Sequence, residues 1–119
     1  MTLTLKQLSA SLERAVEKFE EEEMGIRPGQ VKVMMDEDLV MVHLKGVLSP
    51  SERALARTET GQAMLQRFNT LLFDAGSSPS IKEQVSQTLN REVLEVQTSL
   101  SPLTGSLVVL FPLGRALEA

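Results

Sequence analysis

The chain lacks cysteine, tryptophan and tyrosine, and its only aromatic residues are four phenylalanines. The absence of cysteine excludes disulfides, thiol catalysis and cysteine-ligated metal sites. The shortage of aromatic rings removes the platforms on which the bases of single-stranded nucleic acid stack. The function therefore has to be sought among classes that need neither thiol chemistry nor base stacking.

The chain also lacks a basic run and a long apolar run. Its 119 residues carry 16 acidic and 12 basic side chains, a formal net charge of −4, whereas a nucleic-acid binder usually presents a basic patch. The longest apolar run, 107–111, is far too short to span a bilayer. We therefore predict a cytoplasmic protein that does not bind nucleic acid or insert into a membrane, so any membrane role requires a partner.

Apolar residues at three- and four-residue steps predict several amphipathic helices. The first helix carries a stripe from Leu5 to Phe19 and ends at Gly25, which can take a left-handed conformation. A later helix, ending at Gly76, should bury a stripe made of Met64, Leu65, Phe68, Leu71 and Leu72. A shorter helix opens at Ser80 and turns inward its apolar residues Ile81, Val85 and Leu89.

Two segments change to a period of two and are rich in β-branched residues, which predicts β-hairpins. In the first, "VKVMMDEDLVMVHL", Glu37 and Asp38 form the turn, and the register places Val33 opposite Val42 on the core face. The second surrounds "SPLTG". With Pro102 in the second position of a type I turn, we expect Leu100 to pair with Gly105.

The predicted order is helix, hairpin, two or three helices, hairpin. Hairpins give antiparallel pairing, and helices with single apolar stripes pack on one side of a sheet. We therefore predict an α+β fold in which residues 1–119 form a single domain. This domain is a two-layer sandwich with a four-stranded antiparallel sheet of two hairpins and helices on one face.

The stretch "LKGVLSPSERALARTETG" joins the first hairpin to the helices. Gly46 stands where the backbone leaves the sheet. Ser49, Pro50 and Glu52 match a helix N-cap, a proline at the first helical position and a glutamate at the third, which together form a capping box. Thr58 and Thr60 are alternative candidate caps for a second helical segment. The sequence thus predicts a helix start here, whether or not the junction also borders a site.

The outward face of the sheet is the best candidate for a site, because it is half apolar. We expect its apolar residues to gather into a patch if both hairpins join one sheet, and such patches usually mark interfaces. Coverage by the C-terminal tail or by a further helix is the alternative. The candidate partner-binding residues are Met34, Leu39, Met41, His43, Val108 and Leu110.

The polar residues indicate no catalytic, cofactor or metal site. His43 is the only histidine and lacks an evident orienting partner, so it is interpreted as a sheet-surface residue. The three carboxylates of 36–38 supply too few oxygens for a hard cation. The glutamates of 20–23 oppose the helix dipole, and we interpret them as a solvated helix end or as an acidic docking patch.

The junction also resembles the central motif of the MpsC family of small bacterial proteins. The motif is a strand, Leu-x-Gly-x-Leu, Ser/Thr-Pro, a glutamate and Thr-x-x-Gly, matched here by Leu44, Gly46, Leu48, Ser49, Pro50, Glu52, Thr58 and Gly61. The late "VQTSLSPLTGSLVVLF" is similar to the closing hairpin of the family. One departure is "MGIRPGQ", where the family commonly has a Gly-Arg-Gly-Pro-like segment.

The resemblance implies association with a sodium-linked system that generates membrane potential, and it supplies no catalytic residues. Our leading hypothesis is a non-enzymatic interaction module that forms a homodimer and acts as an accessory or regulatory subunit of a membrane transport system. The alternative is a small-molecule-binding or enzymatic domain with a pocket near Gly46, Thr58 and Gly61.

Overall fold

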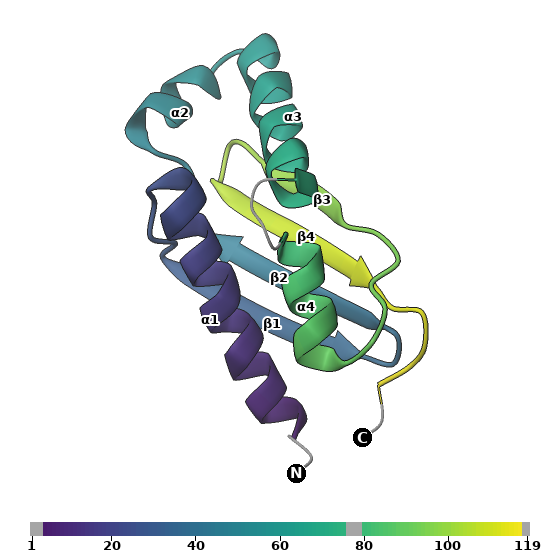
Figure 1. Ribbon diagram of the computed structural model, residues 1–119. Coiled ribbons are helices and arrows are strands. Elements are labelled where there is room, and N and C mark those ends of the chain that lie inside the picture. The colour runs from purple at the N-terminus through teal and green to yellow at the C-terminus, as the bar shows by residue number, and fades with distance from the viewer. Residues whose placement is uncertain (1–3, 76–79, 118–119) are drawn as a thin grey trace.

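The computed structural model describes residues 4–75 and 80–117. Its elements are, in order, α1 (Leu5–Met24), β1 (Gln30–Asp36), β2 (Leu39–Lys45), α2 (Pro50–Leu55), α3 (Glu59–Ala75), α4 (Ile81–Leu89), β3 (Gln97–Ser101) and β4 (Ser106–Pro112). The strands form one antiparallel sheet in the order β1-β2-β4-β3, and α1, α3 and α4 lie on one side of it (Figure 1). The predicted α+β fold and element order are confirmed.

The first hairpin has the predicted register. Val33 pairs with Val42 and Asp36 with Leu39, so Glu37 and Asp38 form the two-residue turn. Glu37 takes a left-handed φ of 52° in this turn. Tight two-residue hairpin turns require such positive φ values, because their twist then matches that of the strands.

The second hairpin differs from the prediction by two residues. Leu100 pairs with Leu107, where we expected Gly105, and β3 begins at Gln97. The turn at Pro102 is correct, since the Thr104 N–H donates to the Ser101 carbonyl at 3.2 Å. However, Gly105 takes a φ of 68° and extends the loop without pairing. A shift of two residues keeps every side chain on its predicted face.

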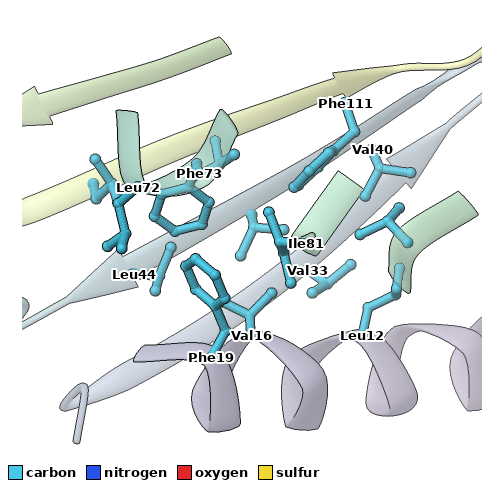
Figure 2. Close-up of a cluster of buried hydrophobic side chains, with 14 of the residues drawn as sticks. Leu12, Val16, Phe19, Val33, Val40, Leu44, Leu72, Phe73, Ile81 and Phe111 are labelled. Atoms are coloured by element: carbon cyan, nitrogen blue, oxygen red, sulfur yellow. The ribbon is translucent and has the colours of Figure 1, made fainter. Parts of the chain in front are cut away.

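The core lies between the sheet and the three helices (Figure 2). Leu12, Val16 and Phe19 of α1 are buried, as the helical spacing predicted. The Phe19 ring meets the Phe73 ring of α3 with centroids 4.9 Å apart, in a tilted arrangement that aromatic pairs prefer. The Gly25 end of α1 is also as predicted, with a left-handed φ of 66°.

The predicted buried stripe of α3 is wrong for three of its five residues. Leu65 and Leu72 are buried, but Met64, Phe68 and Leu71 are 58%, 49% and 59% exposed. Helical residues advance by about 100°, so the five residues span an arc too wide for one contact surface. Leu65 and Leu72 on one side of this arc face the core, and the other side is left in solvent. The predicted end of this helix at Gly76 lies outside the described residues.

Gly61 fixes the close approach of α2 and α3. A Cβ atom at this position would lie 1.8 Å from the Leu55 carbonyl oxygen. Thr58 caps α3 here, since its Oγ1 accepts from the Gly61 N–H at 3.0 Å. Of the two alternatives for this helix start, the one at Thr58 is therefore present in the structure.

Replacing Gly61 with alanine should lower the free energy of unfolding by about 2 kcal/mol, because α2 must move to admit the methyl group. In an unhindered helix the same replacement would raise it by about 1 kcal/mol. Urea unfolding measures the difference, with Thr60→Ala on the exposed side of α3 as the control. A Gly61→Ala protein as stable as the control would contradict the tight helix contact.

Candidate functional site

The outward face of the sheet brings the predicted partner-binding residues together. Met41 pairs with Met34 on one side and Leu110 on the other, in adjacent strands. His43 lies in the next row, opposite Val108. Leu39 begins β2 one row beyond Met41. Antiparallel partners point to the same face, so all six side chains share this surface.

This face is open among the described residues. Met34 is 37% exposed and the side chains of the two central strands are half-buried. The described part of the C-terminal segment, as far as Leu117, does not lie over it. Its Leu117 N–H donates to the Glu37 carbonyl at 2.8 Å, and the Leu117 side chain packs against the core on the helix side. The patch is therefore available to another molecule.

Charged residues stand at the two ends of this apolar patch with opposite signs. Lys32 and Lys45 are exposed near the Gln30 end of the hairpin, and Asp36 is exposed at the other end beside the turn. A surface whose two ends differ in charge can match a partner whose ends are reversed. The charge pattern thus gives the patch a direction along the strands.

The junction residues act as caps and corners. The Ser49 hydroxyl accepts from the Glu52 N–H at 3.2 Å, and the Glu52 carboxylate accepts from the Ser49 N–H at 2.9 Å. Pro50 is the first residue of α2, where its missing donor costs nothing. Gly46 has a φ of 67° and lies against Gly29, where its missing side chain permits contact. These contacts account for the motif by structure alone.

Gly46 also lines a small pocket of about 230 Å³. Its walls come from the β2–α2 junction and the β3–β4 turn, and they are Gly46, Leu48, Arg53, Pro102, Leu103, Thr104 and Gly105. Ligand pockets commonly hold about 300 Å³ or more. Thr58 and Gly61 do not line this pocket.

Glu20 is a feature that the sequence reasoning missed. The sequence predicts a solvated acidic helix end at 20–23, but the Glu20 side chain is fully buried, and neither of its carboxylate oxygens has a hydrogen-bond partner. Burial raises the pKa of Glu20 to about 7, and the nearby Glu52 carboxylate adds to the rise. The four-residue spacing of Leu12, Val16 and Glu20 was the signal that placed it on the inner face.

Two further findings concern ions and membranes. Within residues 4–75 and 80–117, histidine and carboxylate side chains nowhere gather in threes that could hold a metal ion. None of the helices in the same ranges combines the length and the apolar content needed to cross a bilayer. The three acidic residues of 36–38 are exposed at the hairpin turn.

The comparisons with known proteins agree with the motif at the junction. Residues 4–115 match the family described as "Na+-translocating membrane potential-generating system (MpsC)", and the chain belongs to this family. A relative from Bacillus subtilis (strain 168), the uncharacterized protein YbcI, is 24% identical over 111 residues. The alignment covers 93% of this chain and 89% of YbcI. No solved structure matches the chain.

Replacing Glu20 with glutamine should change how stability depends on pH. The folded state holds the Glu20 proton more tightly than the unfolded state does. The stabilisation of the folded state by this difference is therefore complete below pH 4.5 and is lost as the pH rises to about 7. The raised pKa corresponds to about 3 kcal/mol. The stability of Glu20→Gln relative to wild type should therefore rise by that amount across this window.

Urea unfolding at several pH values measures this effect, and the exposed neighbour allows a matched control. Glu23→Gln removes one charge from the same helix end without touching the core. Its pH profile shows the effect of removing one surface charge alone. Parallel pH profiles for wild type and Glu20→Gln would show that Glu20 is solvated in the folded protein.

Proposed function

We propose that this protein is a non-enzymatic interaction module that works as a homodimer, with the outward face of its sheet as the dimer interface. The observation that supports this proposal is the row of half-buried apolar side chains on β2 and β4, which no described segment covers. Methionine side chains adapt to varied surfaces, and the removal of an apolar patch of this kind from water is favourable.

The charge pattern favours one arrangement of the two copies. A two-fold axis between the sheets and across the strands reverses the strand direction, so Lys32 and Lys45 of one copy approach Asp36 of the other. An axis along the strands would instead bring the two basic ends together. Closed homodimers use the same patch twice, and here the patch is self-complementary only in the first arrangement.

This arrangement also defines the central contacts. Two sheets that pack face to face lie about 10 Å apart with side chains interdigitated. The row of Met41 then lies over the row of His43 in the second copy, and Leu110 lies over Val108. The interface is apolar in the middle and charged at both ends, which is the ordinary composition of a specific interface.

The family name supports a role for the proposed dimer in a membrane system. The family name refers to a Na+-translocating system that generates membrane potential, and the described helices of this chain cannot cross a bilayer. We therefore assign the protein an accessory or regulatory role on the cytoplasmic side of such a system, with ion translocation carried out by a membrane partner. In this proposal the junction residues have structural roles, as caps and corners.

Met41→Glu should at least halve the mass of the assembly of 13.1 kDa chains, because it buries a charge in the middle of the apolar interface. Light scattering after size exclusion measures the mass. Leu103→Glu is the matched control, since Leu103 is 88% exposed in the β3–β4 turn and outside the sheet face. An assembly whose mass is the same with and without Met41→Glu would exclude this face as an interface.

The orientation of the two copies is tested by reversing charges. Lys45→Glu alone and Asp36→Lys alone should each weaken the dimer, because each places like charges side by side across the interface. The double variant should regain affinity. If the double variant is weaker than both single variants, the two copies do not meet with their strands reversed.

A tagged protein should recover a Na+-transporting membrane protein from detergent-solubilised membranes of its native host. The expected result is stoichiometric recovery that mass spectrometry identifies and that a tag-only control lacks. Recovery of its own copies alone would contradict the subunit role and leave the homodimer standing.

A further inference from the structure

Helix α3 carries a second uncovered apolar stripe, separate from the sheet face. Met64, Phe68, Leu71 and Ala75 are all exposed, and they follow one another at steps of four, three and four residues. This is the spacing of the seam in a pair of coiled helices. A soluble helix usually turns such a stripe toward its own core, whereas α3 already uses a different side for that purpose.

The stripe points away from the sheet. Gln66 faces β3, since its amide donates to the Thr98 carbonyl at 3.0 Å and its Oε1 accepts from the Leu100 N–H at 2.7 Å. Thr70, one turn on, meets the Thr98 hydroxyl at 2.9 Å. At about 100° per residue, the middle of the stripe lies about 150° around the helix from this side. A helix of another molecule can therefore approach it without meeting the sheet.

The residues beside the stripe carry complementary charges. On one flank Leu65 and Leu72 belong to the protein's own core. On the other flank Arg67 and Asp74 are exposed, seven residues apart, and neither forms an ion pair with another described residue. The stripe is thus bordered by one cation and one anion at the positions that choose the partner helix and its direction.

We propose that this stripe binds a second copy of α3 in an antiparallel arrangement. Antiparallel helices bring the same flank of both copies together, so Arg67 of each copy meets Asp74 of the other. The same alignment places Phe68 against Leu71 of the second copy and Met64 against Ala75. A parallel pair would instead set Arg67 and Asp74 beside the flank already buried by Leu65 and Leu72.

This contact lies on the helix side of the molecule, opposite to the proposed sheet interface (Figure 1). The two interfaces are therefore independent, and both close on a two-fold axis. When both interfaces are used, the dimers join into a larger assembly. Such an assembly would present several copies of the module to one membrane partner.

Engineered cysteines test the alignment directly, because the chain has no cysteine of its own. The test combines Met64→Cys and Ala75→Cys in the Met41→Glu background, so that the sheet interface does not contribute. Under mild oxidation, non-reducing electrophoresis should show a covalent dimer. A disulfide needs Cα atoms within about 7 Å, and the proposed layer brings these two positions together across the pair.

Each single cysteine variant is the matched control. In the antiparallel pair, position 64 of one copy lies about 16 Å from position 64 of the other, so neither single variant should cross-link. Adding Arg67→Asp to the double-cysteine protein should lower the yield several-fold, and adding Asp74→Arg as well should restore it. These last two changes leave the apolar stripe intact.

Two outcomes would overturn the proposal. A double-cysteine protein that stays monomeric on oxidation would show that the stripe does not pair with itself. Single variants that cross-link as well as the double variant would show that any contact lacks the proposed alignment. Either result leaves the sheet-face dimer untouched, since Met41→Glu and its light-scattering test concern the other side of the molecule.

Discussion

The sheet has two faces, and the helices of this chain cover one of them. The central strands β2 and β4 carry apolar side chains on both faces, because Val40, Val42 and Leu44 alternate with Leu39 and Met41. The inner set is shielded by α1, α3 and α4, whereas the outer set has no cover among the described residues. Apolar area that remains in water is a source of free energy for association. The proposed dimer depends on this imbalance.

Much of the fold follows from local sequence signals. The first hairpin has a two-residue turn and a strict period of two, so its register has one solution that buries Val33 and Val42 together. The capping box at Ser49 and the glycine at Gly25 fix helix boundaries in the same way, through contacts made within a few residues. Such signals are legible because they do not depend on distant parts of the chain.

The sequence-based predictions are wrong where a contact with a distant part of the chain determines the local structure. In the second hairpin Gly105 takes a left-handed φ and its carbonyl accepts from the Val47 N–H at 3.1 Å, so the loop is held by another part of the chain. In α3 the sequence shows an apolar arc but not which part of it meets the sheet. The apolar character of the outer face was predictable, because Met34 and Met41 alternate with core-facing residues along their strands. Whether this face is open could be seen only from the position of the C-terminal segment.

Glu20 is a position where the residue present does not favour folding. A buried carboxylate without a hydrogen-bond partner lowers stability at neutral pH, and a helix of this length could have carried leucine there. Glu20 belongs to α1, and the Glu52 carboxylate at the start of α2 is near enough to influence its pKa, so an ionisable group is buried beside the junction. Features that cost stability in a natural protein commonly mark constraints other than folding.

The most direct test of the open-face account is an isotope-filtered NMR experiment on a mixture of labelled and unlabelled protein. The methyl group of Met41 lies in the middle of the sheet patch, and no described segment of its own chain lies over it. The account predicts intermolecular contacts from this methyl group to the His43 ring of a second copy. A spectrum in which Met41 contacts only its own chain and water, at concentrations where the protein is a dimer, would contradict it.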